Sequence, residues 1–100
     1  MRYARRVDFT LKSGQEREFN KIFESKIIPI LEKQKGFQDE LVLTSGRQVT
    51  AISVWDTRQN AETYDMKAYP NVLESLKPFF ETTPNVQPFE VTFATHHAVV

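Results

Sequence analysis

The sequence predicts one α+β domain, residues 1–100, with its elements in the order β-α-β-β-α-β. Segments in which apolar and polar residues alternate, as they do in strands, lie near both ends of the chain and twice in its middle. Two longer segments with apolar residues three or four positions apart, as in amphipathic helices, separate these strands. A chain of 100 residues has room for one hydrophobic core and not for two.

The first strand is predicted over residues 3–11, where the side chains alternate in character. One set of positions contains Tyr3, Arg5, Val7, Phe9 and Leu11, and the other contains Ala4, Arg6, Asp8 and Thr10. This pattern is typical of a strand with one buried face.

The first helix is predicted to begin at Ser13, because Ser13 and Glu16 have the spacing of a capping box. Its apolar stripe consists of Phe19, Ile22, Phe23, Ile27, Ile30 and Leu31. Pro29 lies within this stripe and has no N–H to donate, so we expect a kink from Ser25 to Pro29. Gly36 is predicted to end the helix in the left-handed conformation.

The two central strands are predicted over residues 37–44 and 48–56. The residues Ser45-Gly46-Arg47 join them in a tight hairpin, in which Gly46 supplies a positive φ. Both strands have apolar residues at odd and even positions, which indicates that both faces of the sheet are at least partly covered.

The second helix is predicted to begin at Asp56 or Thr57, either of which can act as its N-cap, and Pro70 is expected to divide it. Its apolar positions are Ala61, Tyr64, Ala68, Tyr69, Val72, Leu73, Leu76, Phe79 and Phe80. The last strand is predicted over residues 86–95. Pro88 favours an edge position for this strand, because a missing N–H costs least there.

This order is that of a ferredoxin-like fold, a four-stranded antiparallel sheet with both helices on one face. The side chains predicted beneath the helices are Val7, Phe9, Leu41, Leu43, Phe89, Val91 and Phe93. The opposite face is predicted to hold Val42, Ile52, Val54 and Ala94 beside Arg6, Asp8, Glu40, Thr50, Glu90 and Thr92. Such a face is too apolar for water and too charged for a core, so we expect a homodimer that packs sheet to sheet. A monomer with an open face is the alternative.

The composition excludes several classes of function. The chain has no Cys, which excludes disulfide frameworks, Cys-based metal sites and thiol nucleophiles. Its 13 basic and 13 acidic residues give zero net charge, which argues against nucleic-acid and membrane-surface partners. No apolar run is long enough to cross a bilayer, and the three glycines form no phosphate-binding loop. We therefore expect a soluble cytoplasmic protein.

Several segments together carry a family resemblance. They are Lys12-Ser13-Gly14, Glu18-Phe19, Gly36-Phe37-Gln38-Asp39-Glu40, Ile52-Ser53-Val54-Trp55, Ala61-Glu62-Thr63-Tyr64, Tyr69-Pro70-Asn71-Val72-Leu73, Phe89-Glu90-Val91 and Thr95-His96-His97. In this order and spacing the chain resembles, over nearly its whole length, the antibiotic biosynthesis monooxygenase family, whose members form dimeric α+β barrels. The resemblance implies oxygenation of an aromatic or lipophilic small molecule without a metal, flavin or haem cofactor.

The resemblance also implies a pocket between the sheet and the helices. The candidate catalytic residues are Asn60, Tyr64, Tyr69 and His97, the candidate substrate-binding residues are Trp55, Phe9, Phe23 and Leu73, and no metal ligand is predicted. Asn60 and Tyr64 lie four positions apart and share a helical face. They resemble the family's Asn and the aromatic residue one turn later, which is Trp in characterised oxygenases and Tyr here. His97 matches the family's terminal His and has a reference pKa suited to proton transfer.

The same residues also fit structural roles. Asn60 can cap a helix, Tyr64 and Tyr69 can be core residues with a solvated hydroxyl, Trp55 lies at a core position, and His97 can be a strand-end or dimer contact. A non-catalytic ligand-binding or dimerisation module is therefore the alternative function.

Haem binding or degradation is a third hypothesis. A haem-degrading branch with this fold has an Asn in the first strand and a His ligand on the second helix. Residues 3–11 contain no Asn and residues 57–81 contain no His, so the sequence gives this hypothesis little support.

Overall fold

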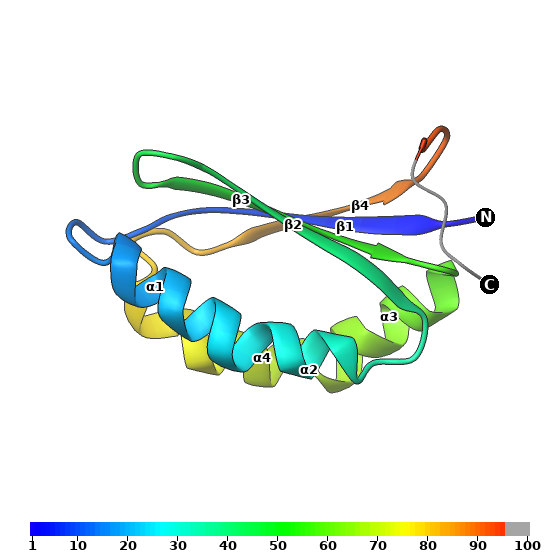
Figure 1. The fold of residues 1–100 in the computed structure, drawn as a ribbon, viewed down its shortest axis with the longest axis horizontal. Coiled ribbons are helices and arrows are strands. Elements are labelled where there is room, and N and C mark those ends of the chain that lie inside the picture. Colours follow the sequence, from blue (N-terminus) through cyan, green and yellow to red (C-terminus); the bar gives the residue numbers. More distant parts are fainter. Residues whose placement is uncertain (96–100) are drawn as a thin grey trace.

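A computed structural model describes residues 1–95 of the chain. Its elements are β1 (Tyr3–Thr10), α1 (Glu16–Ile22), the π-helical turn η1 (Phe23–Ile27), α2 (Ile28–Glu32), β2 (Phe37–Ser45), β3 (Gln48–Trp55), α3 (Arg58–Lys67), α4 (Tyr69–Leu76), the 3₁₀ turn η2 (Lys77–Phe79) and β4 (Asn85–Glu90). The strands form one antiparallel sheet in the order β2-β3-β1-β4, and the helices lie on one of its faces (Figure 1). The predicted ferredoxin-like order is confirmed, with Pro88 on an edge strand.

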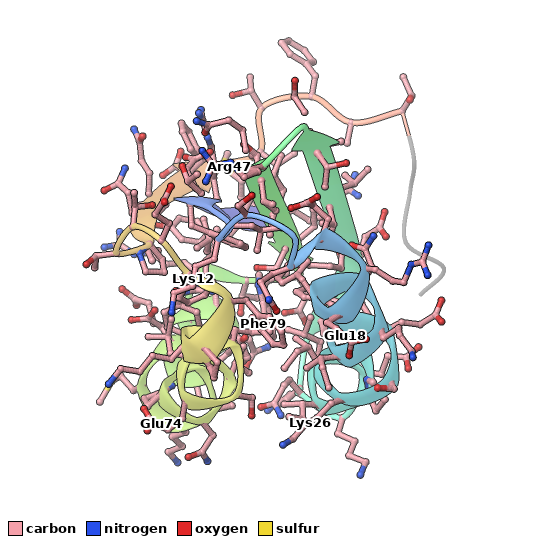
Figure 2. All side chains as sticks on the ribbon, turned by 90° about the vertical axis from the view of Figure 1, so that its left-hand side faces the viewer. Lys12, Glu18, Lys26, Arg47, Glu74 and Phe79 are labelled. Atoms are coloured by element: carbon pink, nitrogen blue, oxygen red, sulfur yellow. The ribbon has the colours of Figure 1, made fainter. Side chains whose placement is uncertain are left out.

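The core lies between the sheet and two helical columns, one formed by α1, η1 and α2 and the other by α3, α4 and η2. Figure 2 shows the two columns side by side, with Phe79 between them and Lys26 and Glu74 on the side away from the sheet. The largest fully buried side chains are Trp55, Phe19, Leu11, Ile27 and Val49. Within residues 1–95, no helix has the length and apolar character needed to span a membrane.

The first helix begins later than the sequence predicts. Gly14 has a φ of +78°, and α1 begins at Glu16 with Gln15 as its N-cap and no capping side chain. The predicted capping box of Ser13 and Glu16 is therefore wrong, because the turn at Gly14 leaves Ser13 outside the helix.

The predicted kink before Pro29 is a π-helical turn. The N–H of Ile28 donates to the carbonyl of Phe23, five residues back, and the Ser25 hydroxyl donates to the Lys21 carbonyl at 2.7 Å. The turn takes up one extra residue, so Pro29 stands in the first turn of α2, where a helix needs no N–H donor.

The second helix follows its prediction. The Thr57 hydroxyl accepts a hydrogen bond from the N–H of Asn60 at 3.1 Å, which identifies Thr57 as the N-cap. The helix is interrupted between Lys67 and Tyr69, next to Pro70.

One extra residue in β2 exchanges the faces that the sequence predicts for this strand. Phe37 pairs with Trp55 and Asp39 pairs with Val54, so Gln38 has no partner of its own and forms a β-bulge. Beyond the bulge, Val42 and Glu40 face the helices, while Leu41 and Leu43 are 47% and 51% exposed on the other face. The predicted placements of these four side chains are therefore wrong.

The last strand is shorter than predicted and also presents its other face. In β4, Phe89 pairs with Ala4 and Glu90 pairs with Tyr3, so Phe89 lies on the face without helices and Glu90 lies on the helix side. The prediction of Phe89 in the core, and of Glu90 opposite it, is wrong. Val91 and Phe93 follow the end of β4, and Phe93 is 93% exposed.

The face without helices, here called the open sheet face, remains rich in apolar side chains. Its apolar members are Ala4, Leu41, Leu43, Ile52, Val54 and Phe89. Two of its charged groups, Arg6 and Asp8, pair with each other: Asp8 accepts from the Thr50 hydroxyl at 2.6 Å and from Arg6 at 2.8 Å. The predicted positions of Ile52, Val54, Arg6, Asp8 and Thr50 on this face are confirmed.

Candidate functional site

An interior cavity of about 40 Å³ lies between the sheet and both helical columns. Its apolar lining consists of Val7, Phe9, Phe23, Ile27, Leu31, Ala51, Val72, Leu73, Leu76 and Phe80. The remaining lining residues carry polar groups and are Arg5, Glu40, Ser53, Tyr64 and Tyr69. In its present form the cavity has room for a few water molecules.

The strand registers place three of the polar residues in one row across the sheet. Glu40 of β2 lies directly opposite Ser53 of β3, and Ser53 lies directly opposite Arg5 of β1. Since neighbouring strands are about 4.8 Å apart, the backbones of Glu40 and Arg5 are about 10 Å apart. The short side chain of Ser53 between them leaves space above the sheet, and this space is part of the cavity.

Arg5 is a buried cation held from several directions. Its side chain is 5% exposed, and its Nη2 donates to the Asp65 carboxylate at 2.6 Å. The guanidinium also lies over the rings of Tyr69 and Tyr64, at 4.3 and 5.1 Å from their centroids. Ion pairing and cation–π contacts together offset the cost of burying this charge.

Glu40 is a half-buried residue, and one of its two carboxyl oxygens is buried without a partner within residues 1–95. Its Oε1 is inaccessible to water and has no hydrogen-bond partner among the described residues. Burial raises the pKa of Glu40 from an ordinary 4.5 to about 8, although the positive charge of Arg5 opposes this rise and Asp39 adds to it. At neutral pH this carboxyl is therefore mostly protonated.

The aromatic side chains form a continuous stack beside Arg5. The rings of Trp55 and Tyr64 are stacked with centroids 4.9 Å apart, and Tyr69 lies 6.1 Å from Tyr64. Burial raises the pKa of Tyr64 and of Tyr69, while Arg5 opposes both shifts. The Tyr69 hydroxyl is buried beside Arg5, and its hydrogen-bonding interaction with Arg5 is one of the effects that oppose the rise in its pKa.

Asn60 faces away from the cavity. Its amide donates to the Asp56 carboxylate at 2.8 Å, at the start of α3. Gly36, with a φ of +83°, lies so close that an added Cβ would collide with both side chains. The first helical column ends at Glu32, earlier than predicted, and Gly36 belongs to the following loop.

The structure brings together five of the eight residues that the resemblance implies. Tyr64, Tyr69, Phe9, Phe23 and Leu73 line the cavity. Trp55 lies behind Tyr64 and donates its indole N–H to Ser53 at 2.9 Å. Asn60 lies outside the lining, and His97 falls outside the described residues.

Three polar lining residues were not among the predicted site residues. Arg5 carries a signal in the sequence, since a charge occupies a core-facing position of the first strand beside Val7 and Phe9. Glu40 carries none, because the bulge at Gln38 reverses its face. Ser53 becomes significant only through its place between the other two.

A surface cleft of about 490 Å³ adjoins the site, lined by Tyr3, Arg5, Arg58, Ala61, Glu62, Asp65, Tyr69, Val86 and Pro88. Arg5 and Tyr69 line both the cleft and the interior cavity. These two side chains therefore form the partition between them.

No family model and no curated protein sequence matches the chain. Among solved structures, a protein of unknown function from Nitrosomonas europaea has a TM-score of 0.80 at 15% identity, covering 98% of this chain and 96% of that one. SnoaB, a cofactor-independent oxygenase from Streptomyces nogalater, has a TM-score of 0.78 at 16% identity, covering 96% and 98%. A proposed antibiotic biosynthesis monooxygenase from Nitrosomonas europaea has a TM-score of 0.78 at 12% identity, covering 95% and 94%. At these identities the likeness confirms the predicted fold.

Proposed function

We propose that this chain is a small cofactor-independent monooxygenase that acts on an aromatic or lipophilic molecule in the interior cavity. The observation that carries the proposal is the lining, in which apolar side chains surround one polar end formed by Arg5, Glu40 and the two tyrosines. An apolar wall suits an aromatic ring, and a buried cation suits an oxygen that becomes negative during reaction. The similarity in fold to SnoaB is consistent with this chemistry.

The proposed reaction uses molecular oxygen as the oxidant and the substrate as the source of all electrons. A phenol that loses its O–H proton becomes an electron-rich phenolate, which can react with oxygen at a ring C–H. One oxygen atom enters the substrate as a carbonyl, two hydrogens leave the substrate, and they form water with the second oxygen atom. The protein's part is to exclude bulk water, orient the ring and stabilise the anion.

Access to the site requires movement, because the cavity is smaller than an aromatic ring in its present form. The surface cleft is the natural route, since only Arg5 and Tyr69 are shared between cleft and cavity. Asp65, which holds Arg5, is half exposed, so this ion pair can separate without unfolding the core. Rotation of Tyr69 would then join the two spaces.

Oxygen consumption with a panel of phenols and hydroquinones tests this function. We expect Tyr69→Phe to lower turnover about tenfold, because it removes the hydroxyl that lies beside Arg5 at the polar end of the cavity. Met66→Ala, at an exposed position of α3, is the control.

Asn60→Ala tests the role of Asn60. An unchanged rate of oxygen consumption would mean that Asn60 only stabilises the start of α3, and a lower rate would mean that it takes part in the reaction. No oxygen consumption with any substrate contradicts the proposal.

The small volume of the cavity favours a second candidate, a ligand-binding module without turnover. This candidate predicts that an apolar ligand raises the melting temperature and is recovered chemically unchanged. A covalent change in the bound compound contradicts it.

We also propose that two copies of the chain associate through the open sheet face. Leu41, Leu43 and Phe89 are each 40% exposed or more on this face. The charges of Arg6 and Asp8 pair with each other within the chain, so a second copy could cover them without leaving either charge alone.

A further inference from the structure

We propose that Glu40 is the proton acceptor of this site, and that its substrates are neutral phenols or enols bound with their hydroxyl between Glu40 and Arg5. This inference rests on the proposed function, because it assumes that the cavity is the substrate site. It adds a catalytic residue, Glu40, that the sequence resemblance does not imply.

The geometry supports this role because Glu40 and Arg5 flank one space. They stand at the two ends of the row that crosses β2, β3 and β1, with only the small Ser53 between them. A hydroxyl above Ser53 would have a carboxyl on one side and a guanidinium on the other. The unpartnered Oε1 of Glu40 is the acceptor such a hydroxyl requires.

The charged and titratable groups around Glu40 come from three directions. Arg5 on β1 stabilises its ionised form, and Asp39 on β2 opposes it. Tyr64 on α3 interacts with its charge, and Asp65 and Tyr69 lie beyond Arg5. The first helical column contributes only Phe23, Ile27 and Leu31 to the lining. Burial among these apolar side chains raises the pKa of Glu40 to about 8, which is close to the pKa of an acidic phenol.

In the proposed step one proton passes from the substrate hydroxyl to the Glu40 carboxylate, and no electron is transferred from the substrate to the protein. The substrate O–H bond breaks, its electron pair stays on the substrate oxygen, and the proton forms a new O–H bond on the Glu40 carboxylate. The step starts from the ionised form of Glu40, whose share grows as the pH approaches 8, and from a neutral hydroxyl, and it ends with neutral Glu40 and a phenolate or enolate next to Arg5. The net charge of the buried site is unchanged, so no additional charge has to be buried.

This step favours neutral hydroxyl compounds over permanent anions. A carboxylate or phosphate group brought to the same place would add a permanent negative charge near Asp65, and among residues 1–95 Arg5 is the one cation of the cavity lining that could balance both. A neutral phenol or enol crosses the apolar lining without its charge, which forms only at the polar end.

Anaerobic binding of phenol tests the inference separately from oxygenation, since free phenol has a pKa of about 10 and stays neutral in water below about pH 9, and its ionised form has a distinct ultraviolet band. Wild type, Glu40→Gln and the control Glu32→Gln, an exposed glutamate on α2, are compared between pH 6 and pH 9. We expect wild type and the control to bind the probe with the band of its ionised form. In Glu40→Gln this band should be reduced about tenfold at pH 8, where about half of wild-type Glu40 is ionised before the probe binds, and the two proteins should differ less at pH 6.

A second measurement uses wild type without any ligand. Carbon-13 NMR of labelled glutamate carboxyls should show one group that titrates near pH 8 and is absent from Glu40→Gln. The Gln side chain has the size of the protonated Glu40 carboxyl, so this variant should keep the fold.

The outcomes distinguish this inference from the proposed function. If Glu40→Gln binds the probe with the same band and pH profile as wild type, or if Glu40 titrates near its ordinary value, the inference is overturned. If the proton transfer is present and no substrate consumes oxygen, the proposed monooxygenase function fails and the role of Glu40 stands. If wild type does not bind the probe, the inference is overturned, and the monooxygenase function is then decided by oxygen consumption with the substrate panel.

Discussion

Glu40 and Arg5 show how single residues set the chemistry of this site. Arg5 has several favourable contacts that stabilise its charged form. Burial disfavours the charged form of Glu40, and Arg5 is the neighbour that favours it. The pKa of Glu40 rises to about 8, so the folded protein holds a proton on this carboxyl that the unfolded chain releases above pH 4.5. The free energy of unfolding is therefore linked to pH through this residue.

We predict that Glu40→Gln stabilises the protein at alkaline pH relative to wild type. Between pH 4.5 and about 8 the folded state binds one proton more than the unfolded state at Glu40, so wild-type stability falls as pH rises. One such group contributes at most about 1.4 kcal/mol per pH unit, and its effect levels off above pH 8.

Urea denaturation of wild type, Glu40→Gln and the control Glu32→Gln at pH 5, 7 and 9 measures this difference. The advantage of Glu40→Gln over wild type should grow from pH 5 to pH 9. A constant difference across this range would mean that Glu40 titrates alike in the folded and unfolded states.

Gly36 acts through backbone conformation and close packing together. We predict that Gly36→Ala destabilises the protein more than Gly14→Ala, although both positions have positive φ. The conformational cost for Ala is about 1 kcal/mol at either position. At Gly36 the new Cβ would also displace Asp56 and Asn60, whereas at Gly14 it would enter open space.

Thermal denaturation of the two glycine variants measures this comparison. Equal melting temperatures would show that the pair formed by Asp56 and Asn60 moves aside without cost.

The same residues show what the sequence can and cannot predict about the site. Tyr64, Tyr69, Phe9, Phe23 and Leu73 could be predicted, because helical and strand periodicity place them toward the core. The core-facing position of Arg5 could also be predicted from strand periodicity. Its ion pair could not, because the partner, Asp65, is 60 residues away in sequence. No periodicity could have placed Glu40, whose orientation depends on one irregular residue.

At the scale of elements, both helical columns are interrupted where proline requires it. The π-helical turn before Pro29 and the break before Pro70 each place a proline in a first helical turn, where its missing N–H leaves no carbonyl unpaired. Both interruptions were predicted from the sequence, because the restriction on proline is local. The capping box at Ser13 was not correct, because Gly14 offered a competing turn.

We predict that Thr57→Ala destabilises α3 by about 1 kcal/mol, since it removes the hydroxyl that accepts from the Asn60 N–H. Thr63→Ala on the same helix is the matched control. Its hydroxyl bonds to a carbonyl that is already within the helix, and Ala is the better helix former. Chemical denaturation should therefore separate the two variants, and equal losses would exclude capping as the cause.

At the scale of the whole molecule, the fold divides the sheet into two unlike faces. One face packs against the helices and contains the site, and the open sheet face has apolar side chains with no helix over them in residues 1–95 (Figure 1). The fold order could be predicted from the alternation of patterns along the chain. The membership of each face could not, because pairing register decides it in β2 and β4.

We predict that wild type sediments as a dimer at micromolar concentration and that Leu43→Arg shifts it to monomer. Leu43 lies on this apolar face, and a charge there would be buried without a partner if a second copy packs against it. Met66→Arg is the control, since Met66 is 76% exposed on α3 and away from the sheet. A wild-type monomer under these conditions contradicts association through the open sheet face.

The β-bulge at Gln38 has a consequence for comparing this chain with its distant relatives. Between Phe37 and Asp39, β2 has one residue more than β3. In a strand without this extra residue, each following side chain would point to the other face of the sheet. A protein of this fold lacking that residue would direct a glutamate aligned with Glu40 toward the open sheet face and a leucine toward the cavity. Evolution could thus convert an acidic site into an apolar one by a single-codon deletion, without substituting any residue of either surface.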